Sequence, residues 1–217
     1  MKLYNILATG SSGNAIIYLD TILVDAGVSQ RKLSPFLDKL ELVLLTHIHG
    51  DHFKESTILN IHKKRPYVRF GCGEWLYDEL VRIGVSESQI DVYEMGVTYD
   101  YGKYEIRAEE LHHNVRNCAY YITGEKKIFH ATDTGKISHL TAEGMDLIAI
   151  ERNWNAETMT RVIKKQMKRG QNFMHGTISQ LYHLSEQLCN EFVFLNAEEH
   201  TEVIYLHESK TYGRLAK

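Results

Sequence analysis

Three histidines and an aspartate lie within six residues of the sequence, directly after an apolar segment. They are His47, His49, Asp51 and His52 in "LVLLTHIHGDHF", residues 42–53. Because side chains at positions i and i+2 of an extended chain point the same way, His47 and His49 can bind one metal ion together. Gly50 then frees the backbone to turn, so that Asp51 and His52 face a second position. The sequence predicts half of a two-metal hydrolytic site.

The donor types indicate which metal and which reaction to expect. Imidazole with a few carboxylates favours zinc, with manganese or iron as less favoured occupants. Two bridged divalent ions lower the pKa of a shared water, so we expect hydrolysis, with Asp51 as the general base. Structural zinc normally closes at four ligands without a carboxylate bridge, which favours a catalytic site. The alternative, surface histidines at a helix start, leaves their clustering to coincidence.

Alternating strand and helix patterns surround this cluster and must position it. Strands are expected up to about Leu7, on both sides of Asp20–Thr21, and over 41–46, 104–111, 118–124, 126–133, 145–151 and 202–207. Helices are expected over about 29–39, 53–64, 74–84, 156–169 and 178–189. Strands that are repeatedly followed by helices indicate a mixed α and β class, with helices covering the sheets. With 217 residues, one domain over 1–217 is the expectation.

Composition excludes several classes of protein. The apolar runs are too short to cross a bilayer and the first residues lack a signal-peptide pattern, so we expect a cytoplasmic protein without a membrane partner. Cys72, Cys118 and Cys189 are widely spaced and form no CxxC pattern, which predicts reduced thiols. A net charge of −3 gives no global attraction to a polyanion, so nucleic-acid binding would need a local basic patch or bound metal.

The HxHxDH pattern resembles the signature of the metallo-β-lactamase superfamily. Four other segments have the order of that family's motifs, one before the HxHxDH pattern and three after it: "ILVDAG" (22–27), "HHNVRNCAYYI" (112–122), "ATDTG" (131–135) and "IYLHES" (204–209). The resemblance implies an α+β fold, a four-layer αββα sandwich of two mixed sheets covered by helices. It also implies a buried structural acid at Asp25. The metal ligands that it implies are His47, His49 and His113 for the first ion, Asp51, His52 and His207 for the second, and Asp133 as the bridge.

The third ligand is chosen from two adjacent histidines. Strand alternation counted from Ile106 puts His112 on the apolar face, whereas alignment with the family favours His113. Asn114 replaces the aspartate of the relatives and Arg116 replaces their proline. The carboxylate that relatives carry beside this ligand is therefore missing here.

His175 precedes a predicted helix with Thr177 as its N-cap and resembles a His-x-Ser-Leu segment that lies near the active site of related proteins. Since an imidazole and a helix N-terminus both suit an anion, we expect His175 to contact phosphate or donate a proton, the alternative being an ordinary histidine. The remaining histidines have no metal-ligand spacing and are expected to be ordinary: His62, His130, His139, His183 and His200.

Among the superfamily's branches, the sequence looks most like the YycJ (WalJ)-type nucleases and their phage-borne relatives. This resemblance implies a phosphodiesterase that cleaves DNA or RNA through a metal-bridged hydroxide. Diiron oxidoreductases of the superfamily carry Glu where this chain has His49, so redox chemistry is disfavoured. Alternatives are hydrolysis of a small phosphodiester such as a cyclic nucleotide, hydrolysis of a thioester or lactam, and a non-catalytic metal-binding module.

Three further segments have two possible roles each. The Gly/Ser loop over 9–14 offers backbone amides to a phosphate or is simply a turn. "RVIKKQMKR" (161–169) and "HKKR" (62–65) track a nucleic-acid backbone or form solvated helix faces.

Overall fold

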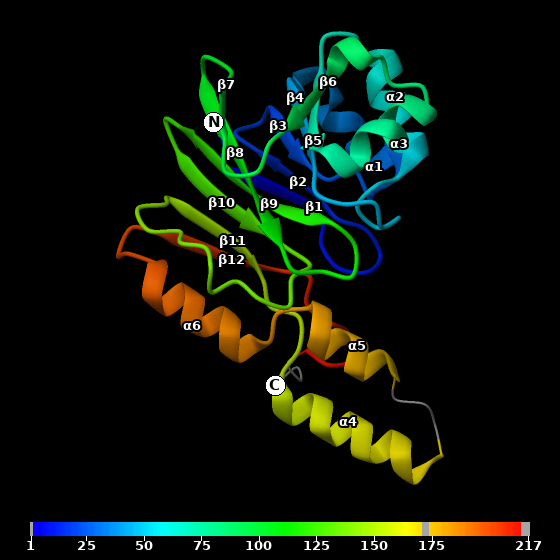
Figure 1. The fold of residues 1–217 in the computed structure, drawn as a ribbon, viewed down its shortest axis with the longest axis vertical. Helices are drawn as coiled ribbons and strands as arrows, with labels where there is room; N and C mark the ends of the chain where they lie inside the picture. Colours follow the sequence, from blue (N-terminus) through cyan, green and yellow to red (C-terminus); the bar gives the residue numbers. More distant parts are fainter. Residues whose placement is uncertain (1, 171–173, 214–217) are drawn as a thin grey trace. The chain divides into compact units, whose positions relative to one another are not determined.

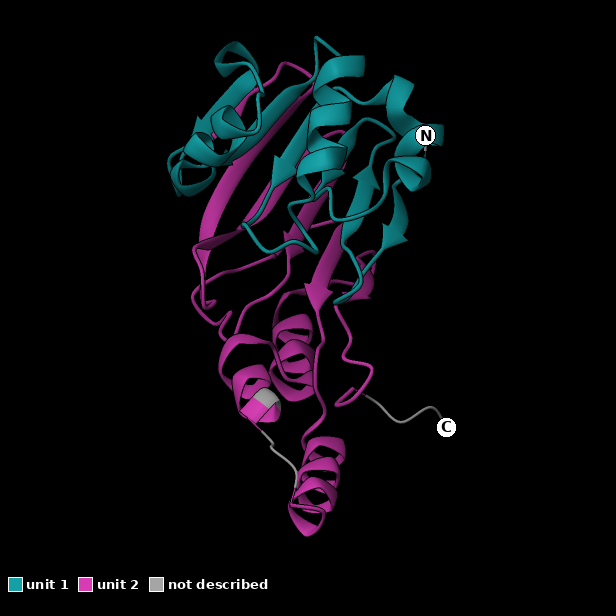
Figure 2. Cartoon of the chain, turned by 90° about the vertical axis from the view of Figure 1, so that its right-hand side faces the viewer, with its two compact units in different colours: residues 1–97 teal, residues 98–217 magenta. Residues whose placement is uncertain are grey.

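The computed structural model describes residues 2–170 and 174–213, except the side chain of residue 175. The chain divides into two compact units, Met1–Val97 (unit 1) and Thr98–Lys217 (unit 2), coloured separately in Figure 2. Each unit contains its own six-stranded sheet, whose strands are labelled in Figure 1. The single domain over 1–217 stays a prediction.

Unit 1 begins with an antiparallel meander and continues with parallel strands, in the order β1-β2-β3-β4-β5-β6. Its strands are β1 (Tyr4–Ala8), β2 (Ala15–Tyr18), β3 (Ile22–Val24), β4 (Leu42–Leu45), β5 (Arg69–Gly73) and β6 (Ile90–Tyr93). Leu19 and Asp20 adopt the left-handed conformation of a tight hairpin turn between β2 and β3. All four residues of β4 are buried, as expected of a parallel strand covered on both faces.

Helices connect the parallel strands of unit 1 and cover its core. They are α1 (Gln30–Leu33), α2 (Glu55–Lys64) and α3 (Tyr77–Arg82), with a 3-10 helix at Ser34–Lys39 directly after α1. Ile58 and Ile61 of α2 and Leu80 of α3 belong to one apolar cluster with the strands. Because β3 and β4 run parallel, their carboxyl ends meet at one edge of the sheet, and the segments from Asp25 and from Thr46 begin side by side there.

Unit 2 has the strand order β12-β11-β10-β9-β8-β7. The strands are β7 (Thr98–Asp100), β8 (Tyr104–Leu111), β9 (Asn117–Gly124), β10 (Lys127–Ala131), β11 (Leu147–Glu151) and β12 (Glu202–Leu206). Strands β7 to β10 pair antiparallel, and β10 to β12 pair parallel. The helices are α4 (Ala156–Lys168), α5 (Met174–Tyr182) and α6 (Glu186–Asn196). The carboxyl ends of β10, β11 and β12 therefore lie at one sheet edge.

The expected class, two mixed sheets with helices, is confirmed, but some elements differ from the sequence prediction. The prediction of one helix over 178–189 is wrong, because α5 ends at Tyr182 and α6 begins at Glu186. Ser185 stops any continuous helix there, since its hydroxyl accepts the Leu188 N–H at 3.1 Å as an N-cap. The segment expected as one helix over 29–39 changes to 3-10 geometry around Pro35. Strands β5, β6 and β7 were not expected.

Two further features concern the described helices and the cysteines. Among the described helices, none combines the length and apolarity that crossing a bilayer requires. Cys72, Cys118 and Cys189 are buried, and within the described residues none of them forms a disulfide. Burial raises the pKa of the Cys72 and Cys189 thiols to about 12, so both stay protonated near neutral pH.

Candidate metal centre

Unit 1 presents two pairs of donor atoms just after β4. His47 Nε2 lies 3.1 Å from His49 Nδ1, and His52 Nε2 lies 3.7 Å from Asp51 Oδ2. Two nitrogens bound to one tetrahedral zinc ion at its usual bond length are about 3.3 Å apart. The His47 and His49 nitrogens therefore already have the separation of two ligands of one ion.

Asp25 supports the two donor pairs through Thr46 and His52. It is buried at φ 60, where its carboxylate accepts the Thr46 N–H (2.9 Å), the Thr46 hydroxyl (3.0 Å) and the His52 Nδ1–H (2.6 Å). Since the Thr46 hydroxyl donates to Asp25, its oxygen accepts the His47 Nδ1–H at 2.9 Å. One carboxylate thus sets the tautomer of two imidazoles, so that Nε2 of each carries no proton and is chemically able to bind a metal.

The Gly/Ser loop over 9–14 braces Asp51 through Asn14. The Asn14 backbone N–H donates to the Asp51 carbonyl at 2.6 Å, and its side-chain Nδ2 lies 2.7 Å from His52 Nε2. Gly27 passes so close that a Cβ on it would lie 1.7 Å from the Asp51 carbonyl oxygen. The Gly10 and Gly13 amides bond within the loop. This bonding favours the structural role of the loop over phosphate binding.

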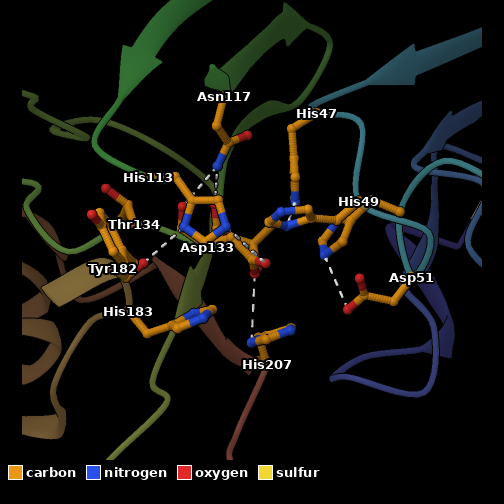
Figure 3. A network of polar contacts seen from close by, with 12 residues as sticks. His47, His49, Asp51, His113, Asn117, Asp133, Thr134, Tyr182, His183 and His207 are labelled. Carbon is orange, nitrogen blue, oxygen red and sulfur yellow. Dashed lines mark hydrogen bonds and ion pairs between the residues drawn. The ribbon is translucent and has the colours of Figure 1, made fainter. Parts of the chain in front are cut away.

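In unit 2, Asp133 directs its two carboxylate oxygens toward two different imidazoles. Oδ2 lies 3.9 Å from His113 Nε2, and Oδ1 lies 3.5 Å from His207 Nδ1 (Figure 3). Asp133 itself has φ 55. The turn around it is held by Asn117, whose Nδ2 donates to the Thr132 and Asp133 carbonyls. A carboxylate that faces two nitrogen donors has the arrangement of a bridging ligand.

The structure separates the two adjacent histidines. His113 Nδ1 donates to the Tyr182 carbonyl at 3.0 Å, which leaves Nε2 facing Asp133. His112 is exposed and stacks on the Tyr182 ring. The alternation that favoured His112 stops at Leu111, where β8 ends. His113 is therefore the histidine beside Asp133.

Glu151 and His183 join this cluster, although His183 was expected to be an ordinary histidine and Glu151 was not expected at the site. Asp133, Glu151, His183 and His207 each offer a ligand atom, and these atoms lie within 4.8 Å of one another. Glu151 accepts the backbone N–H groups of Thr134 (2.8 Å) and Leu184 (3.1 Å), and its other oxygen accepts His183 Nδ1–H at 2.7 Å. The sequence contained one signal for Glu151: this carboxylate follows four apolar residues at the end of β11.

Glu151 and His183 each shift the pKa of the other toward its charged form. Burial alone would raise the pKa of Glu151, but the charge of His183 and hydrogen bonds from His183 and His207 outweigh it and hold this pKa below its ordinary value. Burial lowers the pKa of His183, whereas the Glu151 charge and hydrogen bond raise it, and the net result is a raised pKa. The short contact between Glu151 Oε1 and His183 Nδ1 therefore favours the charged form of both groups within the cluster.

His207 follows β12 and is held by Asn153. Asn153 Nδ2 contacts His207 Nδ1 at 3.0 Å and donates to the His207 carbonyl at 2.8 Å. His207 has φ 51, so Asp25, Asp133 and His207 all adopt a backbone conformation that L-residues rarely take. Such strain persists where the surrounding contacts enforce it, and it is common at functional sites. The side chain of His175 lies outside the described residues.

The donor set fits a divalent metal centre. In each unit, imidazole nitrogens and carboxylate oxygens converge at the carboxyl ends of parallel strands, and buried carboxylates or carbonyls orient the rings. This donor chemistry suits zinc, manganese or iron better than calcium or magnesium. Bound divalent metal is therefore the expected state of the working protein.

Comparisons with known proteins agree with this chemistry. Residues 20–196 match the family described as "Beta-lactamase superfamily domain". The chain is 30% identical over 225 residues to exodeoxyribonuclease WalJ of Streptococcus pneumoniae serotype 2 (strain D39), which covers 95% of this chain and 81% of the relative. It is 26% identical over 172 residues to exodeoxyribonuclease YycJ of Bacillus anthracis, covering 72% and 64% respectively.

A solved structure supports the fold. The metallo-β-lactamase fold protein YhfI from Bacillus subtilis superposes with a TM-score of 0.71 at 16% identity, covering 95% of this chain and 86% of that one. The predicted fold and the resemblance to YycJ and WalJ are both confirmed. The chain belongs to the beta-lactamase superfamily and has the metallo-β-lactamase fold.

Proposed function

We propose that this protein is a metal-dependent nuclease that hydrolyses phosphodiester bonds of DNA or RNA. The observation that carries the proposal is the Asp133 carboxylate, whose two oxygens face the imidazoles of His113 and His207. The relatives named exodeoxyribonucleases support a nucleic-acid substrate. A small phosphodiester such as a cyclic nucleotide is the second candidate, because the same donor set would serve it.

The metal ligands in this proposal come from four segments of the chain. Two divalent ions, with zinc favoured, would be held by His47, His49 and His113, by Asp51, His52 and His207, and by Asp133 as the bridge. When bound, such ions supply a water of lowered pKa and bind the phosphoryl oxygens. The 3.1 Å separation of the His47 and His49 nitrogens supports the first of these sites.

Two residues have proposed roles in proton transfer. Asp51 is the proposed general base, braced by Asn14 through its backbone carbonyl. His183 is the proposed proton donor to the leaving oxygen. Its side chain is 17% exposed, whereas the side chains of Asp133, Glu151 and His207 are 3%, 0% and 8% exposed. Among these four, His183 is thus the one that a substrate can reach, and Glu151 holds its Nδ1.

Localisation in the cytoplasm also remains a proposal, supported by three buried cysteines that form no disulfide in the part of the chain that the structure describes. A third residue, His175, is proposed from the sequence alone to contact phosphate or donate a proton.

A substrate panel tests the proposed function. The metal-loaded protein, supplied with Zn²⁺ or Mn²⁺, is incubated with labelled DNA, labelled RNA, cyclic nucleotides and bis(p-nitrophenyl) phosphate. We expect cleavage of a nucleic acid, and a loss of more than about a hundredfold in His49→Ala and Asp133→Ala, because a lost ligand should cost more than a lost support of a ligand. His200→Ala, an exposed histidine, is the control. Turnover of cyclic nucleotides alone would favour the second candidate, and full activity of both ligand variants would refute the mechanism.

A further inference from the structure

Helix α4 carries a stripe of positive charge that the proposed chemistry does not use. The stripe consists of Arg161, Lys164, Lys165, Lys168 and Arg169, all exposed. These positions follow the spacing i, i+3, i+4, i+7 and i+8, so an α-helix places them on one face. Eight residues at the rise of an α-helix extend over about 12 Å. The cations therefore form a continuous line, which we call the α4 stripe.

The opposite face of α4 anchors the helix to the rest of unit 2. Met159 is buried, and Val162, Ile163 and Gln166 are half-buried. Ile163 packs against α5 at Gly176, where an added Cβ would lie 3.4 Å from the Ile163 side chain. Figures 1 and 2 both show α4 at the end of unit 2 that lies away from the strands. The helix is therefore held by its apolar face, and the α4 stripe faces solvent.

The charges of the α4 stripe are not neutralised by neighbouring acids. Within residues 2–170 and 174–213, none of the five cations forms a salt bridge, whereas Arg69, Arg82 and Lys126 each pair with a carboxylate. Glu157 is the one acid in α4. Because the chain as a whole has a net charge of −3, the stripe is a local concentration of positive charge in an acidic protein. A solvated surface helix normally intersperses both signs.

The start of α4 is tied directly to the metal cluster of unit 2. Glu151 ends β11, Asn153 holds His207, and Asn155 caps α4 by accepting the N–H groups of Glu157 and Thr158 at 3.1 Å. Only four residues separate Glu151 from the first residue of the helix. This short, hydrogen-bonded connection fixes the direction in which α4 leaves the cluster.

We propose that the α4 stripe binds the sugar–phosphate backbone of a nucleic-acid strand whose scissile bond lies at the Asp133–His207 cluster. The inference rests on the proposed function and extends it, because it requires a polymer rather than a mononucleotide. A line of unpaired cations about 12 Å long has the length and charge to contact several successive phosphates. Such contacts hold any sequence, as a nuclease without sequence preference requires.

The test removes the stripe and measures binding separately from hydrolysis. The stripe variant carries Arg161→Gln, Lys164→Gln, Lys165→Gln and Lys168→Gln. The charge-matched control carries Lys2→Gln, Arg31→Gln, Lys32→Gln and Lys39→Gln, four exposed cations of unit 1. Fluorescence anisotropy gives the Kd of each metal-loaded protein for a phosphorothioate single-stranded oligonucleotide, which resists cleavage, over a range of salt concentrations.

We expect the stripe variant to bind the oligonucleotide at least about tenfold more weakly than wild type at low salt. The slope of its plot of log Kd against log salt should be smaller by about 2 to 3, because each single-strand phosphate contact contributes about 0.7 to this slope. The control variant should retain the wild-type Kd within about twofold. All three proteins should hydrolyse bis(p-nitrophenyl) phosphate equally, because this small ester cannot reach α4.

Three results would overturn the inference. The Kd of the stripe variant could match that of wild type, the control could weaken as much as the stripe variant, or wild type could bind phosphatidylserine vesicles more tightly than the oligonucleotide through the same four cations. The last result would identify α4 as a membrane-surface helix. If wild type fails to hydrolyse any phosphodiester, the proposed function fails, while the oligonucleotide Kd values still decide the role of the α4 stripe.

Discussion

His183 differs from the other imidazoles of unit 2 in its partner and its exposure. Its ring lies against those of His113 and His207, with centroids 5.2 and 5.1 Å away, yet its Nδ1 is bonded to the buried carboxylate of Glu151. Glu151 in turn accepts two backbone N–H groups, so it cannot move without breaking the turn after Asp133. This arrangement fixes the orientation of the imidazole and raises its pKa, and both effects suit a proton donor to a leaving group.

Replacing His183 should therefore have an effect that depends on the leaving group. We expect His183→Ala to lower kcat on an oligonucleotide, whose leaving alkoxide needs a proton, by about 10²- to 10⁴-fold. On bis(p-nitrophenyl) phosphate, whose leaving group departs unprotonated, the loss should stay below about tenfold. Steady-state kinetics on both substrates measure this ratio, with His200→Ala as the control. Equal losses on both substrates, together with less bound metal, would show that His183 is a metal ligand instead.

Asp25 is expected to affect metal affinity only through Thr46 and His52, which it hydrogen-bonds. An Asn at this position keeps the size of the side chain but loses the charge that accepts the His52 Nδ1–H and the Thr46 hydroxyl. We expect Asp25→Asn to weaken metal affinity by about 10- to 100-fold, as for other groups that orient ligands. Competition with a chelating dye measures it. Asp20→Asn makes the same change at another positive-φ aspartate, away from the donor pairs, and should match wild type. Wild-type affinity in Asp25→Asn would contradict the proposed support.

At the scale of the elements, the break between α5 and α6 determines which groups reach the site. The Tyr182 carbonyl accepts from His113, His183 bonds to Glu151, and the Leu184 N–H donates to Glu151. A continuous helix would use these backbone groups in its own hydrogen bonds and would turn His183 with the helix face. Three consecutive residues can serve the site because the helix stops at Tyr182.

The N-cap at Ser185 stabilises this break. Ser185 accepts the Leu188 N–H, so we expect Ser185→Ala to lower the free energy of unfolding by about 1 kcal/mol. Urea denaturation followed by circular dichroism measures the change. Thr160→Ala, at an exposed position in the middle of α4, is the control and should change stability by less than about 0.5 kcal/mol. An unchanged denaturation midpoint in Ser185→Ala would show that the cap does not stabilise α6.

For the whole molecule, metal binding should be visible as stability. A ligand that binds only the folded protein at a hundred times its Kd adds about 2.7 kcal/mol to the free energy of unfolding. For a chain of this size, this predicts a rise in Tm of about 5–10 °C for each tightly bound ion. Differential scanning calorimetry of the chelator-treated protein, with and without added Zn²⁺, measures the rise. Asp133→Ala should show little of it, and an equal rise in that variant would place the bound zinc elsewhere.

The sequence alone determined the chemistry of half the candidate site and the class of the fold. The spacing of His47, His49, Asp51 and His52 after an apolar strand is a local pattern, and local patterns can be read directly because strand geometry converts spacing into direction. The same reasoning found most strands and the amphipathic α4. Family resemblance added His113, Asp133 and His207, which no local spacing connects.

Tertiary structure decided what depends on groups distant in sequence. Glu151 and His183 are 32 residues apart, and their pairing arises because β11 ends beside the break between α5 and α6. The placement of His113, rather than His112, beside Asp133 depends on the Tyr182 carbonyl, 69 residues away from His113. Only the tertiary structure shows that, among the described residues, the cations of the α4 stripe form no salt bridge. Partners of a buried polar group are chosen by which strands are neighbours, and a linear pattern of residues does not contain that information.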